Sequence, residues 1–158
     1  MTAKPIYDFA TQKAVGLKGE QFLDTFFASA YLITSATESE QRREIDRWFE
    51  NRESGHRFSV EFKTDATAAR THHAFIETVS VLERGVRGWL HASQAEYLVY
   101  FIPGDAWVIY VLKFEVLRKA FPAWAAKYQL KQIPNRKYTT CGLLVPLAEL
   151  ERIAVVVY

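Results

Sequence analysis

The chain has 158 residues, 49% of them apolar and 15% aromatic, which is enough for one domain with a sizeable core over residues 1–158. Its formal net charge of +2 is too close to neutral to identify a nucleic-acid binder from composition. No stretch approaches the ~20 apolar residues that a membrane span needs, and the first residues lack the apolar block of a signal peptide. The single cysteine, Cys141, excludes an internal disulfide and fits a reducing compartment. These features predict a soluble cytoplasmic protein with no membrane partner.

The first half of the chain predicts a helix followed by strands. A helix over about 14–30 is predicted by an apolar stripe at helical spacing, made of Phe22, Leu23, Phe26, Phe27 and Ala30. A polar loop follows. Alternating apolar and polar residues predict strands over EIDRWFE (44–50) and FSVEFKT (58–64). The turn-forming residues between them join these strands into a hairpin. HAFIETVSV (73–81) predicts a third strand.

The second half predicts another antiparallel pair and further helix. Residues 95–102 and 107–113 flank a PGDA turn and form the pair. Residues 113–129 have helical character, which Pro122 either interrupts or restarts as a second helix. The C-terminal residues predict a short strand, a helical turn at Leu147–Leu150 and an apolar end. This order favours an α/β fold with a central mixed β-sheet flanked by helices.

Several acids occupy positions from which they can meet. Glu61 and Lys63 lie two residues apart on one face of the second strand, and Asp46 lies on the neighbouring strand of the hairpin. Glu20 flanks the apolar stripe of the first helix, and Glu77 lies in the third strand. Each acid alone has an ordinary explanation as a solvated or ion-paired group. Together they favour a shared site.

A cluster of acids calls for a cation. Two carboxylates ~4 Å apart repel each other by about 4 kcal/mol at an effective dielectric constant near 20. Carboxylate oxygens suit Mg²⁺ or Mn²⁺, ions that keep bound waters and bind phosphate oxygens. The adjacent His72 and His73 point to opposite faces of any strand, so they form a poor chelate. Lys63 is placed to orient a water or to stabilise charge growing on a phosphate.

These residues resemble a known family. Asp46, followed fifteen residues later by Glu61-Phe62-Lys63, resembles the PD-(D/E)XK nuclease superfamily, and the helix acid in GLKGEQF resembles its resolvase-like branch. The resemblance covers roughly residues 16–102 and implies a restriction-endonuclease-like core of helix, three strands, helix and strand. The chain departs from the family pattern before Asp46, where Ile45 replaces the proline.

The resemblance implies a role for each residue. Asp46 and Glu61 would bind Mg²⁺ or Mn²⁺ together with the backbone carbonyl of Phe62, and Lys63 would be the catalytic lysine. Glu20 would help to hold the metal or water, and Glu77 would support the site from the third strand. Asp65 would share the Glu61 face if the strand continued, but a turn role is favoured for it.

The implied function is a metal-dependent DNA endonuclease that hydrolyses phosphodiester bonds, with DNA as its partner. Holliday-junction resolution, repair and restriction remain open as its setting. One alternative is a catalytically inactive nuclease-fold module that binds DNA or a protein partner. Another is an unrelated mixed-sheet domain. Many small nucleases act as homodimers because two strands must be cut. Trp89, Trp107 and Trp124 are candidates for such a surface, although tryptophan more often packs in a core.

Overall fold

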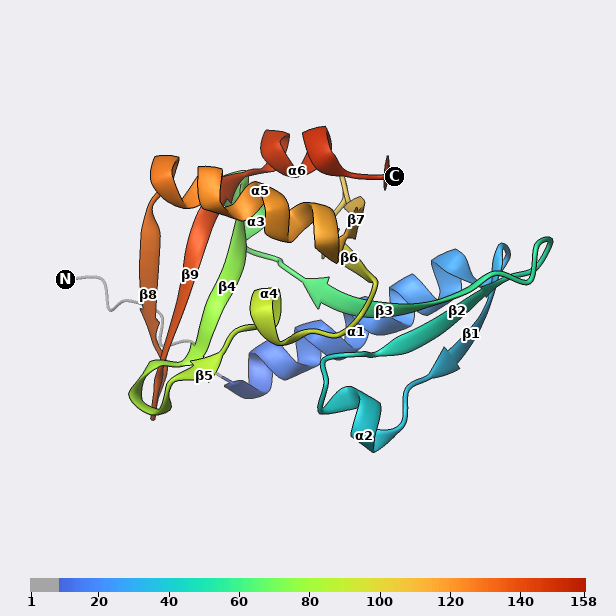
Figure 1. Ribbon diagram of the computed structural model, residues 1–158, viewed down its shortest axis with the longest axis horizontal. Helices are drawn as coiled ribbons and strands as arrows, with labels where there is room; N and C mark the ends of the chain where they lie inside the picture. The colour runs from blue at the N-terminus through green and yellow to red at the C-terminus, as the bar shows by residue number, and fades with distance from the viewer. Residues whose placement is uncertain (1–8) are drawn as a thin grey trace.

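The computed structural model describes residues 9–158 (Figure 1). Its elements, in chain order, are α1 (Phe9–Phe27), β1 (Tyr31–Ser35), α2 (Glu38–Gln41), β2 (Arg47–Asn51), β3 (Arg57–Thr64), α3 (Ala68–Thr71), β4 (His73–Val81), the 3₁₀ turn η1 (Leu82–Arg84), β5 (Val86–Arg87), α4 (Trp89–Ala92), β6 (Tyr97–Ile102), β7 (Val108–Lys113), α5 (Phe114–Lys127), β8 (Leu130–Pro134), β9 (Thr139–Pro146), α6 (Leu147–Ile153) and β10 (Val156–Val157).

The larger sheet contains β1, β2, β3, β6, β7 and β10, in that order. Strand β3 pairs with β6 in parallel, and every other neighbouring pair in this sheet is antiparallel. The sheet is therefore mixed. The long connection from β3 to β6 is what a parallel pair requires, because a tight turn can join only antiparallel strands.

The β2–β3 hairpin has a clear division between its two faces. Arg47 pairs with Val60, and Phe49 pairs with Phe58. Val60 and Phe49 are buried against α1. Because side chains alternate along a strand, Trp48, Ser59 and Glu61 lie on the face turned away from α1.

The smaller sheet contains β5, β4, β9 and β8, in that order, with antiparallel pairing throughout. Its strands come from the β3–β6 connection and from the C-terminal third of the chain. Ile76 of β4 pairs with Leu143 of β9, and both side chains are buried. The two central strands are thus joined by residues far apart in the sequence.

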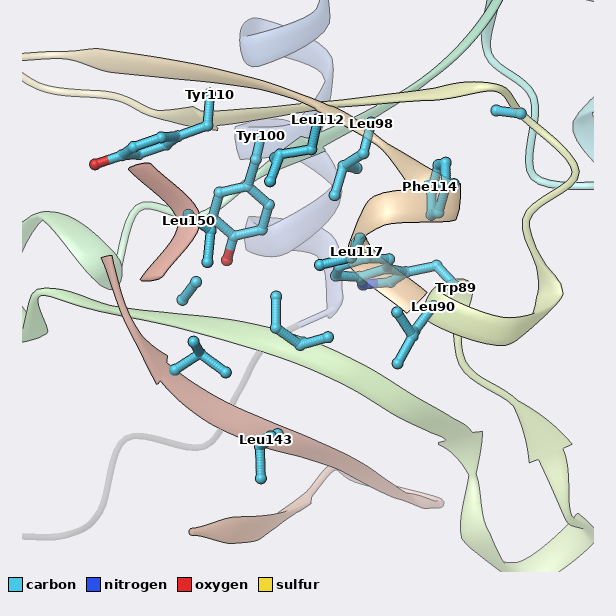
Figure 2. Close-up of a cluster of buried hydrophobic side chains, with 14 of the residues drawn as sticks. Trp89, Leu90, Leu98, Tyr100, Tyr110, Leu112, Phe114, Leu117, Leu143 and Leu150 are labelled. Carbon is cyan, nitrogen blue, oxygen red and sulfur yellow. The ribbon is translucent and has the colours of Figure 1, made fainter. Parts of the chain in front are cut away.

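The larger sheet is packed against α1 on one face and, over β6 and β7, against further elements on the other. One face packs against α1 through Leu23 and Phe27. The other face packs against α4, α5, α6 and the smaller sheet, and Figure 2 shows this second core: Trp89, Leu90, Leu98, Tyr100, Tyr110, Leu112, Phe114, Leu117, Leu143 and Leu150. The predicted mixed sheet flanked by helices is confirmed. Trp89 and Trp124 are buried, whereas Trp107 is 37% exposed.

Several predicted boundaries need correction. Helix α1 ends at Phe27, earlier than predicted, and the unpredicted strand β1 follows it. Side chains of β1 are half-buried or exposed, so this edge strand has little apolar signal. Helix α5 continues through Pro122, and α6 runs to Ile153, beyond the single predicted turn.

The predicted third strand exists as β4, but it lies in the smaller sheet beside β5 and β9 and does not pair with the β2–β3 hairpin. The third strand of the antiparallel set around the hairpin is β1. Hydrophobic alternation identified β4 as a strand but carried no information about its partner.

Within residues 9–158, no helix has the length and apolar character to cross a membrane.

Candidate functional site

Glu61 and Lys63 form the centre of the candidate site, on the face of β3 turned away from α1. The Glu61 side chain is buried, and its Oε1 lies 2.5 Å from Lys63 Nζ. Among the described residues, the other carboxylate oxygen, Oε2, is buried and has no hydrogen-bond partner. Buried polar atoms are almost always hydrogen-bonded, so this orphaned oxygen points to a group that the protein itself does not supply.

The surroundings of Glu61 disfavour its charged form. Its pKa is raised from 4.5 to about 8, first by burial and then by the negative charges of Asp46 and Glu44, while Lys63 acts in the opposite direction. A carboxylate in this environment gains from any further cation nearby.

Asp46 lies one residue before β2 rather than inside it, and its carboxylate is held by the neighbouring strand. Its Oδ2 accepts a hydrogen bond of 2.7 Å from the Phe62 amide, and its own amide donates to Val60 O at 2.9 Å. Because the N–H and C=O of an extended residue point to the same side, the Phe62 carbonyl also faces the Asp46 edge. The structure therefore brings the carboxylates of Asp46 and Glu61 and the carbonyl of Phe62 to one edge of the hairpin.

Glu20 reaches this edge from α1 but is bound to an arginine. Its Oε2 accepts from Arg47 Nη2 at 3.0 Å. Burial raises the pKa of Glu20, and the charge of Asp46 raises it further, so Asp46 and Glu20 interact electrostatically. Arg47 also binds Asp24 through Nε at 3.0 Å and donates from Nη1 to the carbonyl of Asp46 at 3.0 Å.

Sequence reasoning missed this role of Arg47. Alternation along β2 places it on the α1 face, opposite to its neighbour Asp46. Glu20 and Asp24 are four residues apart and share one face of α1. These two patterns together could have identified the contact.

Lys63 has two further acidic neighbours. Glu44 Oε2 lies 3.7 Å from its Nζ. Although burial disfavours the ammonium, the pKa of Lys63 is raised, because Glu61 and Glu44 face it. Glu77, on β4, also interacts with Lys63: burial raises the pKa of Glu77 and the lysine charge lowers it. Glu77 thus approaches the site from the smaller sheet, with its Oε1 accepting from the Trp89 amide at 3.3 Å.

Glu44 was also missed, because it depends on an unusual backbone conformation. Its φ is 55°, a left-handed value that is uncommon for a residue other than glycine. The Ser93 hydroxyl donates to Glu44 O at 2.8 Å, and the Gln94 amide donates to Arg43 O at 2.9 Å, so the strained turn is fixed from α4 and the segment that follows it. Backbone strain of this kind tends to occur at functional sites.

Asp65 takes the predicted turn role. It follows the end of β3, accepts from the Ala68 amide at 3.0 Å and accepts a short hydrogen bond from the Tyr100 hydroxyl. His72 and His73 are exposed and lie at the α3–β4 junction.

The donors at the hairpin edge fit a hard divalent cation in chemistry. They are carboxylate and carbonyl oxygens, the ligands that suit Mg²⁺ and Mn²⁺, and the orphaned Oε2 of Glu61 is among them. In residues 9–158, however, no group of three or more His, Cys, Asp or Glu side chains is arranged to hold a metal ion. Arg47 and Lys63 are the cations that neutralise these acids in the structure.

Comparison of the chain with protein-family models, with curated proteins and with solved structures finds no match. Functional conclusions therefore depend on the residues and contacts described above.

Proposed function

We propose that the protein is a metal-dependent DNA endonuclease of the PD-(D/E)XK type, which hydrolyses phosphodiester bonds with Mg²⁺ or Mn²⁺. One observation carries the proposal: Glu61 is buried beside Lys63 with one carboxylate oxygen unsatisfied, next to the carboxylate of Asp46. A buried acceptor without a partner costs about 1–3 kcal/mol or more, and a ligand at this oxygen would offset that cost.

The order of elements around the site supports the proposal. Helix α1, the antiparallel strands β1, β2 and β3, the short helix α4, and β6 parallel to β3 follow the sequence of helix, three strands, helix and strand that the resemblance implies. Segment α3–β5 lies between β3 and α4 as an insertion into that order.

Each residue then has a role in hydrolysis. Asp46, Glu61 and the Phe62 carbonyl would hold the ion, which supplies Lewis-acid polarisation of the phosphate and a more acidic water. Lys63, held by Glu61 and Glu44, presents an ammonium group that orients the attacking water and stabilises charge developing on the phosphate. Glu20 adds negative charge to the site from α1, and Glu77 does so from β4.

A second candidate is a nuclease fold that binds DNA or a protein partner without cutting. The observation in its favour is that, among the described residues, the acids do not close into a three-ligand group. In that case Lys63 and Arg47 would serve as permanent counter-charges that keep the acids in place.

Cleavage assays separate the two candidates. Supercoiled, linear, branched and single-stranded DNA would each be incubated with the protein in Mg²⁺, in Mn²⁺ and in EDTA. We expect cutting of at least one form with metal and none in EDTA. Lys63→Ala should abolish it, whereas the control Lys119→Ala should not, because Lys119 is exposed on α5 and its ion pair within residues 9–158 is with Glu115.

Two results would count against the proposal, the first against the nuclease function and the second against the assigned site. Wild-type protein that cuts none of the DNA forms yet binds one of them would favour the binding module. Cleavage that survives Lys63→Ala would mean that the catalytic site lies elsewhere in the chain.

A further inference from the structure

Arg57 and Trp48 lie on the same face of the β2–β3 hairpin as the candidate site. Trp48 follows Asp46 by two residues, and Arg57 precedes Glu61 by four residues with Ser59 between them. Strand alternation places these side chains on the face turned away from α1. Figure 1 shows the far end of this hairpin reaching away from α5 and the smaller sheet.

The Arg57 guanidinium lies over the Trp48 ring, 4.4 Å from its centre. Arg57 is exposed and, within residues 9–158, forms no ion pair at salt-bridge distance. This holds even though its cross-strand partner is Glu50, which is also exposed. The guanidinium therefore stacks on an aromatic ring instead of pairing with the acid opposite it on the neighbouring strand.

The ring beneath Arg57 is itself fixed. Trp48 Nε1 donates to Glu40 Oε1 at 3.0 Å, and the other oxygen of Glu40 accepts from the Thr37 amide at 2.8 Å. Glu40 is thus occupied by Trp48 and by the N-terminal cap of α2. The indole provides a rigid surface that restricts the arginine.

The contrast with Arg47 shows that Arg57 has a different task. Arg47 lies on the α1 face, is largely buried and binds both Glu20 and Asp24. Arg57 keeps its planar set of N–H donors directed at solvent. An arginine that stacks on an aromatic ring and retains its donors is well suited to binding phosphate, because the guanidinium loses little further freedom on binding.

We propose that Arg57, held over Trp48, binds a backbone phosphate of the DNA strand that is cut, about four nucleotides from the cleaved phosphate. This inference rests on the proposed function. Strands rise about 3.3 Å per residue, so the four residues from Glu61 to Arg57 span ~13 Å. Along one strand of a duplex the phosphates advance about 3.4 Å per nucleotide in the direction of the helix axis, so ~13 Å corresponds to about four nucleotides when the hairpin lies parallel to that axis.

Binding in EDTA tests the contact without requiring cleavage. Affinity of the protein for labelled duplex and single-stranded oligonucleotides would be measured by fluorescence anisotropy across a range of salt concentrations. The salt slope is the change in the logarithm of affinity with the logarithm of salt concentration, and Arg57→Ala should lower its magnitude by about 0.9 for duplex DNA. If the contact contributes nothing at 1 M salt, this change corresponds to about an eightfold loss of affinity at 0.1 M.

Arg52→Ala is the matched control. It removes the same charge from the same hairpin, but Arg52 Nε donates to Ala28 O at 3.0 Å, next to the end of α1 and away from the Trp48 face. We expect little change from it. Trp48→Phe should keep the affinity because a ring remains, and Trp48→Leu should weaken binding with the salt slope unchanged. Equal losses from Arg57→Ala and Arg52→Ala would overturn the proposal.

The predicted position is tested with a neutral methylphosphonate placed at single phosphates of an oligonucleotide whose cut site has been mapped. Substitution about four nucleotides from the cut should weaken wild-type binding but not binding by Arg57→Ala. Equal sensitivity of the two proteins at every position would refute the inference. DNA binding that depends on Arg57 without any cleavage would sustain the phosphate contact, but it would remove the nuclease function and with it the position relative to a cut. Cleavage with unaltered binding by Arg57→Ala would overturn the contact and leave the nuclease function in place.

Discussion

Replacing Glu61 by glutamine should remove a pH dependence from the stability of the metal-free protein. The pKa of Glu61 is raised from 4.5 to about 8, chiefly by burial. An acid that binds its proton more tightly in the folded state stabilises the fold fully below its unfolded pKa and loses that contribution as the pH rises through its folded pKa. The window for Glu61 therefore runs from about pH 4.5 to about pH 8.

The magnitude follows from the size of the shift. Each pKa unit corresponds to 1.36 kcal/mol, so wild type should lose about 1.4 kcal/mol per pH unit relative to Glu61→Gln inside the window, and on the order of 5 kcal/mol across it. Glutamine keeps an oxygen that can accept from Lys63 Nζ in place of the 2.5 Å contact, but it carries no charge. Any difference between this contact and that of protonated Glu61 shifts the variant's whole curve by a nearly constant amount, because Lys63 stays charged at these pH values. The difference in slope is therefore the reliable quantity.

Urea unfolding in EDTA at several pH values from 5 to 9 measures this difference. The free energy of unfolding of wild type should fall against that of Glu61→Gln up to about pH 8 and then run parallel to it. Glu53→Gln is the control, because Glu53 lies exposed in the hairpin turn and makes no salt bridge among the described residues. Parallel curves for wild type and Glu61→Gln between pH 5 and 8 would show that burial does not raise this pKa.

Mn²⁺ should raise the Tm of wild type but not that of Glu61→Gln. An ion bound only by the native state adds about 2.7 kcal/mol to the free energy of unfolding when its concentration is 100 times its Kd. Calorimetry that shows equal Tm shifts for the two proteins would exclude Glu61 as a ligand. Lys63→Ala should keep the Mn²⁺ shift and lose cleavage, whereas Asp46→Asn should lose both, so a shift that survives Asp46→Asn removes Asp46 from the metal site. Gly19→Ala should lower the free energy of unfolding by about 1–3 kcal/mol despite the better helix propensity of alanine, because its Cβ would lie 1.9 Å from Thr64 Oγ1. Urea unfolding should show a smaller loss in a Thr64→Ala background, and equal losses in both backgrounds would refute the steric explanation.

Local pattern was sufficient wherever neighbouring elements pair with each other. The β2–β3 hairpin and the β6–β7 pair were both predicted, because alternation and a turn define each partner within a few residues. The pairing of β4 with β9 was not, since Ile76 and Leu143 meet across a long stretch of chain. Strand β8 was missed because its side chains are almost entirely exposed.

The residues of the candidate site likewise divide into those that local pattern predicts and those that depend on tertiary contacts. Asp46, Glu61 and Lys63 follow from two adjacent strands of known period, and the structure brings them to one edge. Arg47 depends on the docking of α1 onto β2, and Glu44 depends on a left-handed backbone fixed by Ser93. Local patterns give the faces on which Arg47 and its two α1 acids lie but not the docking that brings those faces together, and no local pattern gives the Glu44 turn.

The balance of charge at the candidate site supports the proposed ion site over a permanent salt bridge. Among the described residues, the acids that interact at this edge are Glu20, Asp24, Glu44, Asp46, Glu61 and Glu77, and the cations that face them are Arg47 and Lys63. Negative charge is in excess, and the pKa of Glu61, the most buried acid of the set, is raised first by burial and then by the neighbouring acids. Glutamine at that position would remove one negative charge from the excess, and Lys63 would keep Glu44 and Glu77 as counter-charges. A divalent cation at the unsatisfied Oε2 would favour the carboxylate form of Glu61. The surplus acids, which repel one another without the ion, would then offset its positive charge.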